Sequence, residues 1–183
     1  MSVHDEAQSS WLAPEKKLIG RRPADGRFTL GVCLGSQLLG EGLGARVYRN
    51  RWKQIGWFPV ERCFPNESAL FSSFPRRFPV FQWHGETFDL PPGTTHLATS
   101  EACSIQAFEH VYALGIQFHL EVTEDEVSDV VRESGHEIDS GSYEQTPAQI
   151  LAATDHFAGC VGRLTEILDA VKKRIACSGS LVT

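Results

Sequence analysis

Residues 29–40 are Thr29-Leu-Gly-Val-Cys-Leu-Gly-Ser-Gln-Leu-Leu-Gly40, a run that predicts a buried strand turning abruptly into a helix. The apolar residues before Cys33 suit a parallel strand, and the residues after it begin a helical pattern. Gly31 and Gly35 flank the cysteine, so the motif is Gly-x-Cys-x-Gly, the arrangement of a nucleophile elbow. We therefore expect Cys33 to stand at the turn between strand and helix.

An elbow of this kind makes its central cysteine chemically accessible. The turn holds the central residue in a strained conformation, in which side chains at Gly31 and Gly35 would collide with the neighbouring strand and helix. The helix N-terminus favours thiolate over thiol at Cys33, and its N–H groups suit an oxyanion formed beside the sulfur. The alternative interpretation is a buried cysteine that only packs between two glycines.

Composition is that of an ordinary globular chain, with 183 residues, 42% hydrophobic and 22% charged, which predicts one domain with a substantial core. A net charge of -6 and the lack of long basic runs argue against nucleic acid or an anionic membrane as a partner. The segment Met1-Ser-Val-His-Asp-Glu6 has no apolar core, and no apolar run is long enough to cross a bilayer. These features predict a soluble cytoplasmic protein.

The five cysteines are widely spaced and include no Cys-x-x-Cys pair. A disulfide framework or a zinc cluster is therefore not expected, and no metal site is predicted. Only Cys33 has a local pattern that suggests reactivity, while the others are expected to be packing residues: Cys63, Cys103, Cys160 and Cys177.

Short strands dominate the middle of the chain, and helices are expected near its two ends. Strands are predicted at residues 45–48, 54–60, 80–84, 96–100, 105–108 and 112–118, a succession that indicates an antiparallel or mixed part of a sheet. Helices are predicted from Ser9 until Gly20 and Pro23 stop the first one, across residues 68–74, after Thr123, and from Thr146-Pro147 onward.

The last helix carries an amphipathic stripe and an expected interruption near Thr154-Asp155. Its apolar residues recur at three- and four-residue steps, which predicts that the stripe packs against a sheet: Ile150, Phe157, Val161, Leu164, Leu168, Val171 and Ile175. Residues 178–183 are expected to form a frayed tail after a domain spanning residues 1–177.

A cysteine nucleophile needs a base, and two of the seven histidines are candidates. His119 follows the apolar strand of residues 114–118, and the two-residue period of extended chain puts Glu121 on the same face. The carboxylate could then fix the imidazole tautomer and stabilise imidazolium. Alternatively, His-x-Glu caps the strand or belongs to a metal site, although no third ligand stands at a readable spacing.

His84 is the second candidate, in the strand-to-loop junction Trp83-His-Gly-Glu86. It could shape a substrate site or be an ordinary half-buried histidine. The other five histidines occur in polar loops, at strand starts or on the terminal helix, where a surface histidine needs no special explanation: His4, His96, His110, His136 and His156.

Three ordered motifs resemble those of the class I glutamine amidotransferases, in particular stand-alone proteins similar to the amidotransferase domain of GMP synthase. They are Gly-Val-Cys-Leu-Gly-Ser-Gln (31 to 37), Phe-Gln-Trp-His-Gly-Glu-Thr-Phe-Asp-Leu-Pro (81 to 91) and Gly-Ile-Gln-Phe-His-Leu-Glu (115 to 121). The resemblance runs from Met1 to about Leu168. It implies an α/β, three-layer, flavodoxin-like fold with a mixed sheet.

The resemblance also implies a role for each matching residue. Cys33 would be the nucleophile, His119 the general base and then acid, and Glu121 the orienting carboxylate. Gln37 matches a position that contacts the glutamine side chain, and the Leu34 amide would supply one oxyanion donor. The remaining residues expected to line the substrate site are Gly35, His84 and Gly85. The implied reaction is hydrolysis of L-glutamine through a γ-glutamyl thioester, which requires no cofactor.

Two departures from the family pattern concern the N-terminal part. In the family, the segment resembling residues 1–6 follows strands of the central sheet and a Gly-Gly loop that donates a second oxyanion N–H. Roughly 50 residues of that kind are missing, a β-α-β unit and more, so we expect an N-terminally truncated fold with apolar sheet edges exposed. Gly20 and Pro23 stand where relatives run a longer helix, which predicts a local remodelling of that helix.

Two classes of function follow from these observations. The first is an active glutaminase-type enzyme, which acts on L-glutamine or another γ-glutamyl amide and passes ammonia to a separate synthase where one is present. The second is a truncated, catalytically impaired amidotransferase-like protein that serves as a binding module, or a chain whose start was assigned too far downstream. The ammonia acceptor and the oligomeric state are not determined by the sequence.

Overall fold

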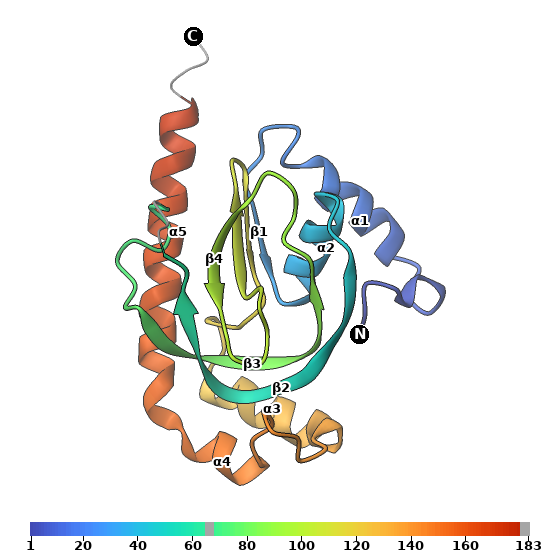
Figure 1. Cartoon of the computed structure of the whole chain (residues 1–183), viewed down its shortest axis with the longest axis vertical. Coiled ribbons are helices and arrows are strands. Elements are labelled where there is room, and N and C mark those ends of the chain that lie inside the picture. The colour runs from blue at the N-terminus through green and yellow to red at the C-terminus, as the bar shows by residue number, and fades with distance from the viewer. Residues whose placement is uncertain (65–67, 180–183) are drawn as a thin grey trace.

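A computed structural model describes residues 1–64 and 68–179, and the strands within these ranges form one mixed, curled sheet (Figure 1). Its order is β1-β6-β5-β4-β2-β3, with β1 parallel to β6 and the other pairs antiparallel. The strands are β1 (Thr29–Val32), β2 (Val47–Arg62), β3 (Arg77–Phe88), β4 (Thr95–Thr99), β5 (Ala107–His110) and β6 (Ala113–Ile116). The predicted mixed sheet is confirmed.

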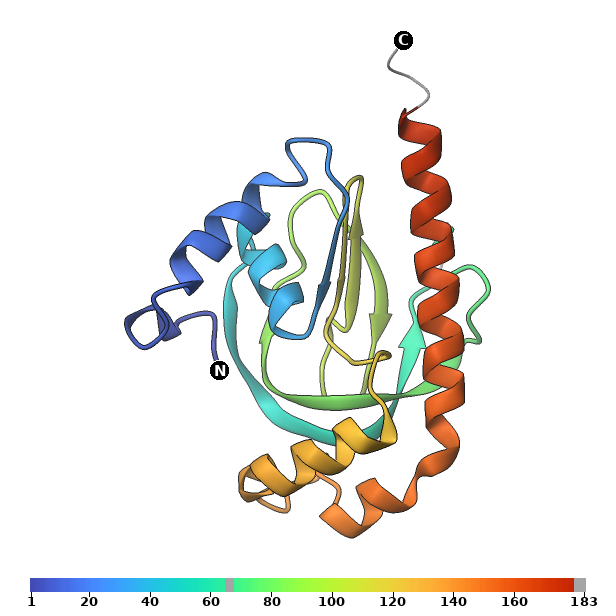
Figure 2. The same ribbon diagram turned by 180° about the vertical axis from the view of Figure 1, so that it is seen from behind.

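Helices cover both faces of this sheet, as Figures 1 and 2 show from opposite sides. The helices are α1 (Leu12–Arg21), α2 (Leu34–Gly42), α3 (Glu124–Ser134), α4 (Pro147–Ala152) and α5 (Phe157–Gly179), with 3-10 turns η1 (Asp5–Ala7), η2 (Gly135–Glu137) and η3 (Thr154–His156). One face packs against α1 and α2 in a core that includes Leu12, Leu39 and Phe108. The other face packs against α5 through residues such as Ile167. The three-layer prediction is confirmed.

Two of the helix starts expected from the sequence coincide with capping boxes, whereas the first helix, expected from Ser9, begins at Leu12 without a side-chain cap. Thr123 accepts a hydrogen bond from the Glu126 N–H, and the Glu126 side chain bonds back to the Thr123 N–H. Thr146 and Gln149 make the same reciprocal pair at the start of α4, with Pro147 as its first residue. Such caps satisfy N–H groups that have no partner within the helix. The expected interruption near residues 154–155 is confirmed as η3, between α4 and α5.

Two local predictions were wrong. The strands expected at residues 45–48 and 54–60 are one strand, β2, with a register shift between Arg49 and Gln54. Residues 68–74 form turns and no helix. Their carbonyls are bound from β2, where the guanidinium of Arg62 donates to the carbonyl of Phe74 at 2.6 Å. This tertiary contact replaces the hydrogen bonds of a helix in that segment.

Gly20 lies inside α1, which continues to Arg21 before Pro23 ends the helical run. The helix therefore ends between Gly20 and Pro23, as the sequence predicts. Gly20 also allows close packing, because a Cβ on Gly42 of α2 would lie 2.6 Å from the Cα of Gly20. The two helix backbones can approach this closely only because neither residue has a side chain.

The stripe on α5 is buried in part. Phe157, Leu164 and Val171 pack against the core, whereas three residues spaced seven apart are about half exposed: Val161, Leu168 and Ile175. The buried face is centred on Cys160 and Ile167, which are fully buried. The helix is therefore rotated relative to the expected stripe. It also extends to Gly179, beyond the start expected for the tail, and residues 180–183 lie outside the described part.

β1 lies at one edge of the sheet, and β6 is its single neighbour among the described strands. Its apolar residues Leu30 and Val32 are half-buried and face the same core as Leu114 and Ile116 of β6. Among the described strands, β1 is thus an edge strand whose apolar side chains pack against the core.

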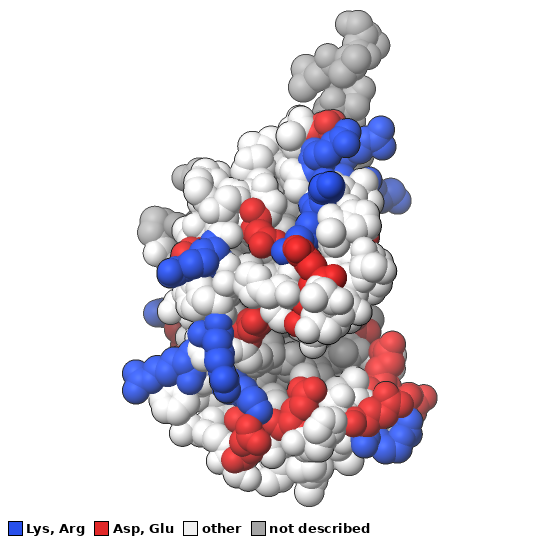
Figure 3. Space-filling model, turned by 90° about the vertical axis from the view of Figure 1, so that its right-hand side faces the viewer, with Lys and Arg blue, Asp and Glu red and all other residues white. Residues whose placement is uncertain are grey.

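Charged side chains of both signs are interspersed on the face shown in Figure 3, so that face carries no large patch of one sign. Across the ranges 1–64 and 68–179, no helix combines the length and apolar character needed to span a membrane.

Candidate active site

Cys33 is the N-cap residue of α2 and adopts φ 50° and ψ -111°. It is one of the described non-glycine residues with a positive φ. Its N–H donates to the carbonyl of Ile116 at 2.8 Å, which extends the pairing of β1 with β6 up to the turn. Positive φ is rare for a residue with a side chain and is held here by the surrounding strand and helix. The predicted strand-to-helix turn with Cys33 at its apex is therefore confirmed.

The two flanking glycines have different roles. A Cβ on Gly31 would overlap the backbone of Gly35, so the turn requires glycine at that position. A Cβ on Gly35 would meet no atom within 4 Å. The predicted collision is confirmed for Gly31 and wrong for Gly35, because Gly35 lies in the first turn of α2 with open space beside it.

The start of α2 presents free N–H groups beside the sulfur. Leu34 and Gly35 are its first residues, and N–H groups in a first helical turn have no partner within the helix. Ser36 strengthens the turn, because its hydroxyl donates to the Cys33 carbonyl at 2.7 Å. The positive end of a helix dipole and these N–H groups favour an anion at Cys33.

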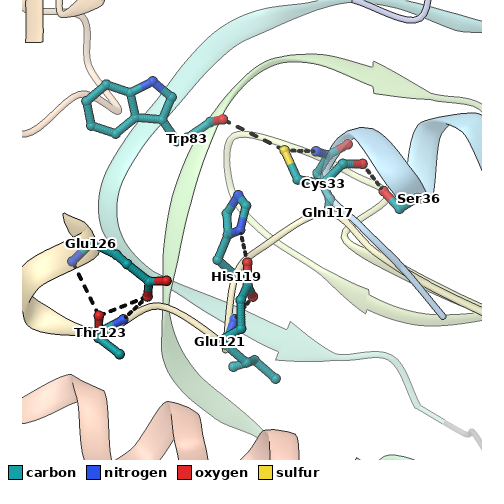
Figure 4. Close-up of polar contacts among 9 residues, drawn as sticks. Cys33, Ser36, Trp83, Gln117, His119, Glu121, Thr123 and Glu126 are labelled. Carbon is teal, nitrogen blue, oxygen red and sulfur yellow. Dashed lines mark hydrogen bonds and ion pairs between the residues drawn. The ribbon is translucent and has the colours of Figure 1, made fainter. Parts of the chain in front are cut away.

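His119 faces Cys33 from the segment that follows β6 (Figure 4). The backbone N–H of His119 donates to the carbonyl of Phe81 on β3 at 2.9 Å. On the imidazole ring, Nδ1 lies 2.5 Å from Oε1 of Glu121. The other carboxylate oxygen of Glu121 accepts the Leu120 N–H at 2.9 Å. Since Nδ1 is bound to Glu121, Nε2 is the ring nitrogen left for Cys33.

The His119–Glu121 pair is charged. Burial opposes a charge on the imidazole, but hydrogen bonds and Coulomb attraction to Cys33 and Glu121 outweigh it and raise the pKa of His119 to about 10. Burial likewise works against the Glu121 carboxylate, yet its bond to His119 lowers the pKa of Glu121. An imidazolium is therefore held beside the sulfur, which suits a thiolate.

His84 is buried, and both of its ring nitrogens are engaged within the protein. Nδ1 lies 3.0 Å from the carbonyl of Glu86, and Nε2 lies 3.1 Å from Oε1 of Gln82. Burial lowers the pKa of His84 to about 4, against the opposing effect of the Glu86 bond. A neutral imidazole has a single N–H and can donate to only one of these two oxygens. With the Glu86 carbonyl as that partner, His84 braces the loop of Gly85 and Glu86.

A cavity of about 500 Å³ brings most of the expected site residues together. Its lining includes Cys33, Leu34, His84, Gly85 and His119, joined by residues from the rim such as Lys53, Trp83 and Glu137. Gln37 lines an adjoining cavity of about 310 Å³ that also reaches Cys33 and Gly85. Gly35 and Glu121 line neither of these two cavities.

Size alone does not select this site. A cavity of about 800 Å³, lined in part by Phe58, Arg77 and Tyr143, lies elsewhere on the sheet and contains no cysteine or histidine. No group of three His, Cys, Asp or Glu side chains suited to a metal ion occurs in the described ranges. The chemistry at Cys33 is what distinguishes the smaller cavity.

Three bonds fasten the segment after α3 across the rim of the cavity. The indole of Trp83 donates to Oε2 of Glu137 at 3.2 Å. The ammonium of Lys53 donates to the Glu137 carbonyl at 2.7 Å and lies 2.5 Å from Oδ2 of Asp139. Sequence reasoning missed these four residues. Only the position of Trp83 inside the His84 motif gave a signal for any of them.

Gln117 is another residue that sequence reasoning missed. It is fully buried, and its side-chain Nε2 lies 3.7 Å from Sγ of Cys33. The two-residue period that connects His119 with Glu121 also places Gln117 on the same face, but it carries no information about a contact with Cys33, 84 positions earlier in the chain. Gln37, expected to contact substrate, donates instead to the Gln117 side chain and to the carbonyl of Glu86.

The remaining cysteines differ from Cys33. Cys103 and Cys160 are buried, and burial raises the pKa of both thiols, that of Cys160 to about 11. Burial also raises the pKa of the half-buried Cys63. These positions agree with the predicted packing roles, whereas the side chain of Cys177 lies outside the described part.

Comparisons with known proteins agree with this geometry. The sequence model described as "Glutamine amidotransferase class-I" matches residues 13–136. The glutamine amidotransferase-like protein YfeJ of Salmonella typhimurium is 33% identical over 126 residues, covering 68% of this chain and 53% of the relative. A glutamine-hydrolysing GMP synthase subunit from Thermococcus kodakarensis is 36% identical over 100 residues, covering 53% of this chain and 52% of the relative.

Solved structures show the same architecture. A glutamine amidotransferase from Thermotoga maritima matches with a TM-score of 0.82 and 35% identity, covering 92% of this chain and 73% of that structure. A glutamine amidotransferase from Methylobacillus flagellatus matches with a TM-score of 0.85 and 26% identity, covering 95% of this chain and 73% of that structure. The chain spans about half the length of the curated relatives that it matches.

Proposed function

Because this chain belongs to the class I glutamine amidotransferase family, we propose that it hydrolyses the γ-carboxamide of L-glutamine through a thioester on Cys33. One observation carries the proposal: Cys33, at the strained N-cap of α2, faces the charged pair of His119 and Glu121. A thiolate, a proton donor and an anion-binding helix terminus thus converge on one cavity.

In the first half of the reaction, the Cys33 thiolate attacks the γ-carbonyl carbon and forms a C–S bond. The carbonyl electrons move to oxygen, where the Leu34 N–H at the start of α2 stabilises the negative charge. The C–N bond then breaks as the His119 imidazolium gives its proton to the nitrogen. Ammonia leaves, and a γ-glutamyl thioester remains on the enzyme.

In the second half, neutral His119 takes a proton from water while the water oxygen attacks the thioester carbon. The C–S bond breaks, which regenerates the thiolate and releases glutamate. Glu121 stays ionised throughout, because its task is to hold Nδ1–H and stabilise the imidazolium. None of these steps needs a metal or an organic cofactor.

The other expected site residues are proposed to shape the substrate site. The Gln37 side chain reaches the adjoining cavity, where its carboxamide oxygen can accept from the substrate amide. Gly85 and the braced His84 form the wall opposite α2, and Gly35 leaves space at the first turn of the helix. This arrangement fits the extended side chain of glutamine or of another γ-glutamyl amide.

A separate synthase is the proposed acceptor of the ammonia. Several relatives are named as glutamine-hydrolysing GMP synthase subunits, which supports a similar division of labour here. We also propose a cytoplasmic location, where both glutamine and a synthase that accepts the ammonia would be available.

The test is glutamate release from L-glutamine by the wild-type chain and by Cys33→Ala, with Cys63→Ala as the control for loss of a thiol elsewhere. We expect release by the wild type and the control, and none above buffer from Cys33→Ala. A glutamine-like electrophile should add its mass at Cys33 alone. Equal release by wild type and Cys33→Ala would refute the proposal. Assays with γ-glutamyl anilides determine whether the leaving group must be ammonia.

A second candidate function is an impaired amidotransferase-like protein that binds glutamine without turnover. It is favoured by the position of β1 at the sheet edge, because the strand that positions Cys33 is bonded to β6 on one side. Labelling of Cys33 by the electrophile, together with no glutamate release, would support this candidate against the first.

A further inference from the structure

Gln117 occupies a position directly behind the sulfur of Cys33 (Figure 4). The side chain is fully buried, and its Nε2 donates to Sγ at 3.7 Å. Its backbone is held as well, because the Gln117 N–H donates to the carbonyl of Gln106 at 2.8 Å. The carboxamide therefore meets Sγ from a fixed point inside the protein.

Gln37 determines which end of that carboxamide faces the sulfur. Its Nε2 donates to Oε1 of Gln117 at 3.2 Å and to the carbonyl of Glu86 at 3.4 Å. Both partners accept hydrogen bonds, so the amino end of Gln37 must point at them. The oxygen of Gln117 is thereby occupied, and its N–H group is left for Cys33.

The groups around Sγ favour different protonation states of the thiol. A protonated Cys33 donates to the carbonyl of Trp83 at 3.9 Å. A thiolate cannot donate, and a carbonyl oxygen beside it is repulsive. The N–H group of Gln117 has the opposite preference, because a hydrogen bond to the charged form of a group favours that form.

We infer that Gln117 stabilises the thiolate of Cys33 through its side-chain N–H, and that Gln37 is a positioning residue acting through Gln117. This inference deepens the proposed function, since it names a further group that contacts the reacting sulfur. It also assigns Gln37 a task that precedes substrate binding. The competing interpretation is that both glutamines only fill the interior between α2 and the sheet.

The test measures the rate at which iodoacetamide alkylates Cys33 as a function of pH, followed by mass spectrometry of the peptide that contains it. Gln117→Met preserves the volume and removes the N–H, and Gln106→Met is the matched control. The Gln106 side chain is equally buried but donates to Gln54 and Ser100. Cys33→Ala identifies alkylation at other cysteines.

We expect the midpoint of the alkylation profile to move to higher pH in Gln117→Met, with a rate at neutral pH lower on the order of tenfold, as suits a lost bond to a charged group. Gln37→Met should shift the midpoint in the same direction by less, and Gln106→Met should leave it unchanged. A Gln117→Met profile that coincides with wild type in a folded protein would overturn the inference.

A second variant covers the case in which Gln117→Met does not fold. Gln117→Asn keeps a polar side chain but withdraws its N–H by one methylene, so it should shift the midpoint as well, and an unchanged profile in this variant also overturns the inference. Alkylation requires no glutamine turnover. A shifted profile without glutamate release would therefore refute the proposed function alone, and release with unshifted profiles would refute this inference alone.

Discussion

The Nδ1 atom of His119 lies 2.5 Å from Oε1 of Glu121, and the second oxygen of that carboxylate is fixed by the Leu120 N–H. The carboxylate is thus bound at both oxygens by two consecutive residues of one segment. A carboxylate held in this way keeps the imidazole in one orientation and one tautomer, with Nε2 directed at Cys33. His119 and Glu121 therefore form one rigid unit attached to β3 through Phe81.

Replacing Glu121 should disable this unit without unfolding the chain. In Glu121→Gln, the amide can donate to Nδ1 and hold the wrong tautomer, so we expect glutamate release to fall by roughly 10²- to 10⁴-fold. Steady-state kinetics would place the loss in kcat. The control is Glu124→Gln, an exposed carboxylate in the first turn of α3. Equal activity of Glu121→Gln and wild type would contradict the assigned role.

The charged pair also predicts a pH dependence of stability. The pKa of His119 is raised to about 10 in the folded protein. Its contribution to the free energy of unfolding is therefore fully present below the pKa of about 6.5 in the unfolded chain, and it is lost as pH rises toward 10. The pKa of Glu121 is lowered, so its contribution is present above its unfolded value of about 4.3 and is lost as pH falls through its folded value. The pair should therefore stabilise the folded protein most between about pH 4.3 and 6.5.

The measurement is the difference in Tm between wild type and His119→Gln across pH 4 to 10. We expect the largest difference in that window and a decline toward pH 10. NMR of the His119 ring gives a direct check, because its signal should not titrate between pH 6 and 8. A midpoint near 6.5 would show that no charged pair exists.

The elbow and the His119–Glu121 pair were predictable because each is encoded in a few neighbouring residues. A strand, two glycines and a helix predict the turn at Cys33, and a two-residue period places His119 beside Glu121. The capping boxes at Thr123 and Thr146 are local in the same way. Each of these features depends on contacts within a few positions along the chain.

Features that depend on distant partners were not predictable. The turns of residues 68–74 form because Arg62, from another strand, binds the carbonyl of Phe74. The rotation of α5 is set by what its inner face meets, such as the carbonyl of Pro79 beside Cys160. The contact between Gln117 and Cys33 joins residues 84 positions apart. Periodicity alone carries no information about such pairs.

The two glycines of the elbow provide a matched pair of substitutions. A Cβ on Gly31 would overlap the Gly35 carbonyl, so Gly31→Ala must distort the turn and should lower the free energy of unfolding by roughly 1–3 kcal/mol. Gly35→Ala adds a methyl group to open space within a helix, where alanine is favoured by about 1 kcal/mol over glycine. It should therefore be neutral or slightly stabilising.

Urea denaturation of both variants measures these differences, and alkylation of Cys33 reports whether the turn is intact. The prediction fails if Gly31→Ala is as stable as wild type or if Gly35→Ala is the more damaging of the two.

The rim contacts should control access to the cavity. Lys53 and Asp139 form an ion pair of partly exposed side chains, and the Trp83 indole donates to Glu137. Together they hold the segment after α3 against β2 and β3. Such pairs are worth up to about 1 kcal/mol, so Lys53→Met should change KM by at most about fivefold. The side chain of Met preserves the aliphatic stem, which isolates the effect of the charge.

Salt separates the ion pair of Lys53 and Asp139 from the hydrogen bond of the Trp83 indole. Because screening weakens an exposed ion pair but not a neutral hydrogen bond, the wild-type KM should drift toward that of Lys53→Met as sodium chloride approaches about 1 M. Trp83→Phe keeps an aromatic wall and removes the indole N–H, so its effect on KM should be independent of salt. Steady-state kinetics of the three proteins at low and high salt measure this. A wild-type KM that is insensitive to salt, with Lys53→Met unchanged, would show that the ion pair does not hold the rim.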